Sequence, residues 1–169
     1  GRQVRNGKDH GEIFDHHFVE FTYDSGAVIA SQCRHQPGCM RRVDEPLQGT
    51  QGSVNTGKGK LTNLEGNEIY KYKSDPLNEP NPYQVEHDKL FASIRNGGVI
   101  ADAENGAKST LTAIMGRMAT YSGKVITWDQ AMNSDLQIMP ESLDWNTNPP
   151  TMPDNNGMYS IPTPGITEF

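Results

Sequence analysis

The sequence has little of what membrane, nucleic-acid-binding and zinc proteins require. No apolar run approaches the about 20 residues that cross a bilayer. A single basic doublet, Arg41-Arg42, in a chain of net charge -6 argues against nucleic acid or an anionic membrane as a partner. Cysteine is limited to Cys33 and Cys39, without His or Cys partners at zinc-ligand spacing. This pair can form a small disulfide or remain as two thiols, and we favour thiols.

Motifs for cofactor binding and nucleophilic catalysis are also missing. There is no Gly-x-Gly-x-x-Gly after a strand, no phosphate loop, no Gly-x-Ser-x-Gly and no His-Glu-x-x-His. The absence of these motifs argues against most functions that need a bound cofactor or a catalytic nucleophile within this chain. The chain opens without Met, on Gly-Arg-Gln-Val-Arg directly before a strand pattern, so we expect a fragment of a longer protein.

What is abundant is turn-forming sequence. The 17 glycines and 11 prolines among 169 residues indicate many turns and ordered loops rather than a helix bundle. A chain of this length can form one domain with a sizeable core.

The clearest helical signal lies in residues 81–122. Apolar residues spaced three and four apart predict two amphipathic helices, separated by Asn96-Gly97-Gly98. Asp102 is placed to cap the second helix. Gly106, Ala113 and Gly116 leave little side-chain bulk on its flanks, so that a sheet or another helix can approach closely. The predicted buried stripes are His87, Leu90, Phe91 and Ile94 in the first helix, and Ala103, Ala107, Thr110, Leu111, Ile114, Met118 and Tyr121 in the second.

Strand patterns dominate the part of the chain before residue 74. Aromatic and β-branched residues alternate from Glu12 to Tyr23, and a turn at Asp24-Ser25-Gly26 predicts a hairpin with Ala27–Arg34. Further strands are expected in Gly49–Thr56, Lys60–Leu64 and Glu68–Lys73. Strands followed by helices, with hairpin-length connections, predict an α+β fold in which an antiparallel sheet is covered on one face by helices.

After the helical pair, Thr127 and Gln130 fit a capping box that begins a short third helix. We assign residues 1–139 to the α+β domain and residues 140–169 to a proline-rich, ordered tail that packs on it. The tail should be held to the surface by Trp145, Met152, Met158 and Tyr159.

Three polar clusters are candidates for chemistry. In Asp15-His16-His17 the imidazoles lie on opposite faces of a strand, so they cannot bind one ion together, and a structural or solvent-exposed role is favoured. Around Arg34-His35-Gln36 a strand opens into a loop, where ligands often bind. Arg34 can bind an anionic oxygen and His35 can donate a hydrogen bond to a hydroxyl. A salt bridge at the sheet edge explains the presence of these residues equally well. On the first helix, His87 is expected to be a core histidine.

The amino-acid sequence resembles the C-terminal half of the Gfo/Idh/MocA family of oxidoreductases. It is most similar to a bacterial branch of dehydrogenases often made with a twin-arginine export signal. The similarity covers essentially the whole chain. The segments that carry it are GRQVRNGKDHGEIFDHHFVEFTYDSGAVIASQCRHQPGC, NPYQVEHDKLFASIRNG, AENGAKSTLTAIMGRMATYSGKVITWDQAMNS and the NPP…NGMYSIPTPG tail.

The resemblance implies a large, mostly antiparallel sheet with helices on one face, following a Rossmann domain that is absent here. It implies NAD or NADP in the full-length protein, with no cofactor, metal or catalytic residue expected in this fragment. The substrate would be a sugar or polyol, bound with the help of Arg34, His35 and Gln36. Some relatives instead use NAD to cleave glycosides. A stand-alone binding or self-association module is the alternative from another class.

The expected partners are the protein's own Rossmann domain and a second copy, because the family pairs through the open sheet face. Export to the periplasm is expected from the family branch, and the cytoplasm is the alternative.

Overall fold

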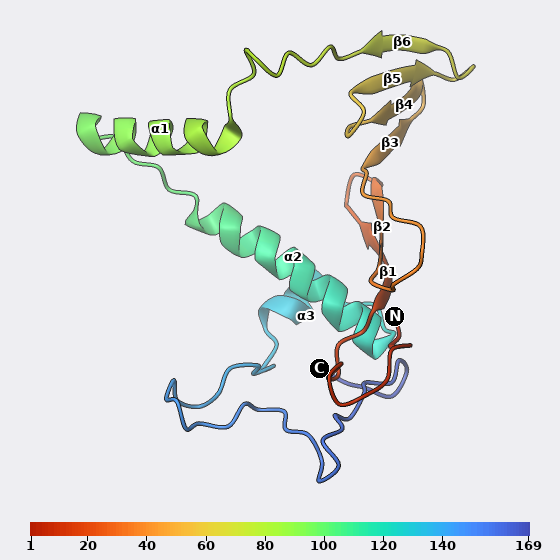
Figure 1. The fold of residues 1–169 in the computed structure, drawn as a ribbon, viewed down its shortest axis with the longest axis vertical. Coiled ribbons are helices and arrows are strands. Elements are labelled where there is room, and N and C mark those ends of the chain that lie inside the picture. Colours follow the sequence, from red (N-terminus) through yellow and green to blue (C-terminus); the bar gives the residue numbers. More distant parts are fainter. The chain divides into compact units, whose positions relative to one another are not determined.

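The computed structural model describes all residues from 1 to 169 (Figure 1). Its elements are β1 (His16–Thr22), β2 (Val28–Arg34), β3 (Pro46–Gly49), β4 (Gly52–Asn55), β5 (Lys60–Asn63), β6 (Glu68–Lys71), α1 (Pro82–Asn96), α2 (Ala103–Ser122) and α3 (Trp128–Met132). They form two compact units: unit 1 is Gly1–Pro37 with Asp102–Phe169, and unit 2 is Gly38–Ala101.

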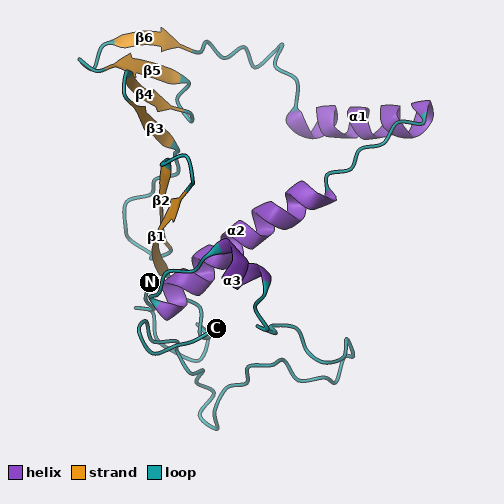
Figure 2. Ribbon diagram, turned by 180° about the vertical axis from the view of Figure 1, so that it is seen from behind, coloured by secondary structure: helices purple, strands orange, loops and turns teal.

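The predicted α+β class is confirmed. All strand pairings are antiparallel, and helices and strands occupy separate stretches of the chain (Figure 2). No parallel β-α-β crossover of the Rossmann type is present. The strands are divided between a two-stranded sheet, β1-β2, and a four-stranded sheet in the order β3-β4-β5-β6.

In unit 1 the predicted hairpin is confirmed. β1 and β2 pair in a register that sets His16 opposite Arg34 and Thr22 opposite Val28. The connection closes because Gly26 adopts a φ of 83°, in the left-handed region that glycine tolerates best. The Tyr23 amide then donates to the Ala27 carbonyl at 2.9 Å. The ends of β1 and β2 that are distant from this turn therefore lie side by side, which positions the site described below.

The core of unit 1 lies where the C-terminal half of α2 meets β1. Tyr121, 1 % exposed, stacks on the Phe14 ring with centroids 4.2 Å apart, and its hydroxyl accepts a hydrogen bond from the Phe14 amide at 2.9 Å. Beside them, His17 contacts Thr120 Oγ1 at 3.0 Å and the Phe14 carbonyl at 3.1 Å. His17 therefore has a structural role, the one favoured for the adjacent histidines.

Close packing of α2 on β1 depends on Gly116. A Cβ at this position would lie 2.9 Å from Phe21 Cζ, closer than side chains approach one another. The expectation that Gly116 admits a sheet is thus confirmed. At Gly106, by contrast, an added Cβ would meet nothing within 4 Å, and the stripe of α2 is buried only in its C-terminal half.

α3 begins with the predicted capping box. Gln130 N donates to Thr127 Oγ1 at 3.2 Å, and Thr127 N donates to Gln130 Oε1 at 2.8 Å. This arrangement satisfies two amide groups that the start of a helix otherwise leaves unpaired. α3 packs against α2, and Ala131 is buried.

The tail, residues 140–169, contacts the end of α2, but not all of the residues expected to hold it there do so. Gly165 N donates to the Ser122 carbonyl at 2.6 Å, and Lys124 pairs with Glu168 at 2.8 Å. Both termini consequently lie beside the C-terminal end of α2 (Figures 1 and 2). Trp145, however, is 104 % exposed, so the prediction that it holds the tail to the surface is wrong.

Unit 2 contains a four-stranded antiparallel meander. Gly49–Thr56, predicted as one strand, is divided by a tight turn between β3 and β4. Gly52 begins β4 with a φ of 155°, and because a Cβ there would collide with the Thr62 carbonyl, only glycine lets β5 pair this closely. The hairpin predicted across Glu65-Gly66-Asn67 is confirmed as β5-β6.

Helix α1 has the predicted ends but not the predicted burial. Asn81 caps it by accepting a hydrogen bond from Tyr83 N at 3.0 Å, and Gly97 ends it with a φ of 68°. None of its residues is buried, and Phe91 is 48 % exposed. The prediction of a core histidine at 87 is wrong, since His87 is exposed and its Nδ1 contacts only the Tyr83 carbonyl of its own helix, at 2.7 Å.

Candidate functional site

A hollow of about 210 Å³ lies in unit 1, where the start of β1 meets the residue that follows β2. The backbone continues the hairpin past its last strand residues, because His35 N donates to the Asp15 carbonyl at 2.9 Å. The N-terminal segment forms the remaining walls. The residues that line the hollow are Gln3, Arg5, Asp9, His10, Ile13, Phe14, Asp15 and His35.

Asp15 holds the N-terminal segment over the start of β1. Its buried carboxylate accepts hydrogen bonds from Val4 N at 3.0 and 3.1 Å, from Arg5 N at 2.8 Å and from His16 Nδ1 at 2.6 Å. Burial raises the pKa of Asp15, but the hydrogen bonds from His16, Arg5 and Val4 outweigh burial and lower it from 3.8 to about 2. Asp15 is therefore ionised at neutral pH and fixes the wall rather than moving a proton.

Gln3 adds an incompletely satisfied amide to the same wall. Its Nε2 donates to the Arg5 carbonyl at 2.9 Å and to the Gly11 carbonyl at 3.2 Å, which fixes the amide plane. Its Oε1 is buried and has no hydrogen-bond partner. A buried acceptor of this kind is costly, so a hydroxyl donor reaching it would bind favourably.

The structure separates the three predicted substrate residues. His35 lines the hollow. Arg34 stands opposite His16 in the hairpin register and is exposed, and Gln36 is exposed in the following loop; neither lines the hollow.

Among the neighbours of His35 in the hollow, only Asp15 belongs to a cluster that the sequence offered as a candidate. Gln3, Arg5, Asp9 and His10 were not predicted, because the N-terminal segment that carries them has no recognisable motif. The two histidines after Asp15 have different neighbours, as expected for residues on opposite faces of a strand. His16 binds Asp15, while His17 contacts Thr120.

The lining suits a small polyhydroxylated molecule. Arg5 and the imidazoles of His10 and His35 can donate to hydroxyl oxygens, Asp9 can accept, and Ile13 and Phe14 offer apolar surface. Sites for drug-sized ligands run from about 300 to 1,000 Å³, so this hollow admits only a small ligand. No group of three or more His, Cys, Asp or Glu side chains is arranged to hold a metal ion, and none of the helices has the length and apolar character needed to cross a membrane.

No protein-family model matches the chain, and neither a curated protein nor a solved structure shows significant similarity to it.

Proposed function

We propose that this chain is the C-terminal, substrate-binding and oligomerisation domain of an NAD(P)-dependent oxidoreductase of the Gfo/Idh/MocA family, acting on a sugar or polyol. In this proposal an upstream Rossmann domain binds NAD or NADP and supplies the catalytic residues. The proposal includes the larger architecture that the resemblance implies, a large, mostly antiparallel sheet covered on one face by helices.

The observation that carries the proposal is the resemblance over essentially the whole chain. Two of the segments that carry it contain whole helices: NPYQVEHDKLFASIRNG begins at the Asn81 cap of α1 and ends at Gly97, and AENGAKSTLTAIMGRMATYSGKVITWDQAMNS contains α2 and α3. The antiparallel pairing of all strands is compatible with the sheet that the family would require.

The hollow at His35 supports the substrate-binding part of the proposal. Donors, acceptors and apolar surface meet there in a volume suited to a small polyol, and one of the three predicted substrate residues is among them. Because the Asp15 carboxylate fixes the wall through backbone amides, the hollow is organised before any ligand arrives.

The apolar face of α1 supports the need for a partner. Leu90, Phe91 and Ile94 are 45, 48 and 65 % exposed, and they are spaced along one side of the helix. Exposed apolar groups that follow one another in this way commonly mark an interaction surface. The proposal assigns the chain two partners, its own Rossmann domain and a second copy bound through the sheet face.

A titration of the chain with a panel of sugars and polyols tests the proposal. The imidazole resonances of His10 and His35 should shift in a saturable way with the cognate polyol, while that of His87, exposed on α1, should not. Calorimetric titration with NAD and with NADP should show no tight binding. Micromolar binding of either nucleotide to this chain alone would overturn the proposal.

In the full-length protein, His35→Ala should raise KM for the polyol about tenfold, the cost of losing one or two hydrogen bonds to a ligand. Gln36→Ala, one residue outside the hollow, is the matched control and should leave KM unchanged. Equal effects of the two variants would remove His35 from the substrate site. Light scattering of the chain should show a dimer or larger oligomer, and an 18.7 kDa monomer at high concentration would contradict the oligomerisation role.

A further inference from the structure

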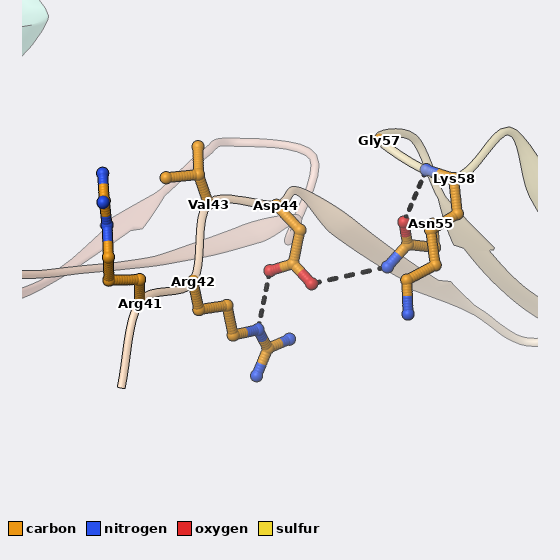
Figure 3. Close-up of a pocket in the computed structure, with 7 residues that line it drawn as sticks. All are labelled: Arg41, Arg42, Val43, Asp44, Asn55, Gly57 and Lys58. Carbon is orange, nitrogen blue, oxygen red and sulfur yellow. Dashed lines mark hydrogen bonds and ion pairs between the residues drawn. The ribbon is translucent and has the colours of Figure 1, made fainter. Parts of the chain in front are cut away.

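A second hollow, of about 490 Å³, lies entirely within unit 2 (Figure 3). One wall is the loop before β3, and the other is the turn that joins β4 to β5. The residues that line it are Arg41, Arg42, Val43, Asp44, Asn55, Gly57 and Lys58. Three of them are cations and one is an anion, which gives the hollow a formal charge of +2.

A chain of hydrogen bonds joins the two walls. Arg42 Nε donates to Asp44 Oδ1 at 2.8 Å, and Asn55 Nδ2 donates to Asp44 Oδ2 at 3.4 Å. Asn55 Oδ1 in turn accepts from Lys58 N at 2.9 Å. The hydrogen bond from Arg42 lowers the pKa of Asp44, so the central acceptor of this chain is ionised at neutral pH. Arg42 and Lys58 are thereby held at the two ends of one connected structure.

The strongest donors of this hollow have no acceptor in the chain. Arg42 uses only Nε, which leaves both terminal amino groups unpaired, and Lys58 Nζ makes no hydrogen bond. Figure 3 shows the Arg42 guanidinium and the end of Lys58 extending to the same side of the Asp44–Asn55 bridge, whereas Arg41 extends to the other side. The arrangement thus presents a planar fork and an ammonium group together.

The surrounding charge does not cancel this local excess. The chain as a whole carries -6, but unit 2 contains eight basic and eight acidic residues, so the negative excess belongs to unit 1. An anion approaching the hollow therefore meets a positive field on a neutral unit.

We propose that this hollow binds the phosphate group of a small phosphorylated molecule, or free phosphate. A phosphate monoester carries about -1.5 to -2 charges at pH 7 and three acceptor oxygens, so it can engage the Arg42 fork and the Lys58 ammonium at once, whereas a carboxylate has one charge and two oxygens. An arginine fork recognises phosphate oxygens in pairs, and lysine adds a point charge. The inference is independent of the proposed oxidoreductase role, because it concerns other residues in the other unit.

A titration of the ¹⁵N-labelled full chain tests the proposal. With inorganic phosphate or glucose 6-phosphate, the Lys58 amide and the Asn55 side-chain amide should shift together and saturate. Tighter binding of glucose 6-phosphate would identify an ester as the ligand, and equal binding would identify free phosphate. Glucose, which lacks the phosphate, should leave both signals unchanged. Linear, unsaturable shifts with every anion, including chloride, would overturn the proposal.

Adjacent arginines provide the matched variants. Arg42→Gln and Lys58→Gln should each weaken phosphate binding about tenfold, since each removes a charge-assisted hydrogen bond. Arg41→Gln removes the same charge from a side chain that extends away, and should weaken binding only about twofold through the field. The Gly52 and Thr62 amides report whether the β-sheet is retained. If Arg41→Gln and Arg42→Gln weaken phosphate binding equally while the sheet is intact, binding is nonspecific electrostatic attraction, and the proposed site is overturned.

Discussion

The C-terminal half of α2 and the whole of α1 differ in burial although they are built by the same local devices. Both helices end at a glycine with a φ of 68° whose amide donates to the carbonyl four residues earlier. Yet Met118 and Tyr121 of α2 are buried in the core of unit 1, while α1 has no buried residue. Local sequence thus decides where a helix begins and ends, and a partner of suitable shape decides whether its apolar face is covered.

What α2 has and α1 lacks is a surface shaped to receive it. Gly116 lets the Phe21 ring approach the helix backbone, and the Tyr121 hydroxyl satisfies the Phe14 amide in the same contact. In α1 the glycines lie only beyond its end, and no strand of unit 2 packs on its apolar side.

The largest effect should come from Tyr121→Ala. It deletes the most buried ring, its stack on Phe14 and the acceptor of the Phe14 amide, so the free energy of unfolding should fall by about 3–5 kcal/mol. Urea unfolding followed by circular dichroism measures it. Phe91→Ala in α1 is the control and should change the free energy by less than about 0.5 kcal/mol. A comparable loss at Phe91 would show that the face of α1 is covered in solution, and would break the comparison.

The second effect compares a buried carboxylate with an exposed one. Asp15→Asn replaces a buried ion that accepts from two amides and an imidazole, and should cost about 1–3 kcal/mol in urea unfolding. Glu104, at the exposed start of α2, pairs only with Lys108 at 2.6 Å, so Glu104→Gln should cost less than about 0.5 kcal/mol. Similar costs for the two substitutions would mean that Asp15 does not hold the N-terminal segment.

The same carboxylate should make the stability of unit 1 depend on acid pH. Because folding lowers the pKa of Asp15 from 3.8 to about 2, its contribution is fully present above pH 3.8 and disappears as pH falls through 2. Thermal melting across this range should show wild type approaching Asp15→Asn as the pH falls. A constant difference between the two proteins would contradict the lowered pKa.

Features that depend on a few neighbouring residues could be predicted from the sequence. The capping box at Thr127, the glycine that ends α1 and the turn at Gly26 are each encoded by residues that contact one another locally. The coarse α+β class followed from strand patterns in the first part of the chain and helix patterns after them.

Features that depend on distant partners could not be predicted. Periodicity showed that Leu90 and Phe91 share a face but not whether anything covers it. At the site, His35 was selected because strands often open into ligand-binding loops. Arg5 was not, because its link to Asp15 runs through a backbone amide, which every residue carries and no sequence pattern reveals.

A third effect tests why α2 is buried at one end only. Gly116→Ala places a Cβ 2.9 Å from Phe21 Cζ and should cost about 1 kcal/mol, since overpacking outweighs the gain in helix propensity. Gly106→Ala meets nothing within 4 Å and should instead stabilise by about 0.5–1 kcal/mol. Thermal unfolding of both variants measures the difference. Stabilisation by Gly116→Ala would show that Phe21 moves freely and that close approach is not what holds α2 on β1.

The smallest effect is expected at the exposed start of α2. Asp102 occupies the N-cap position, but its side chain makes no cap hydrogen bond, so Asp102→Ala should remove only a dipole interaction worth about 0.3 kcal/mol. Thr127→Ala, which breaks the capping box of α3, should cost about 1 kcal/mol. Urea unfolding of the two alanine variants compares a cap that is only positional with one that is hydrogen-bonded. Should Asp102→Ala cost as much as Thr127→Ala, the Asp102 carboxylate caps α2 in solution, and the two ends of that helix differ in packing alone.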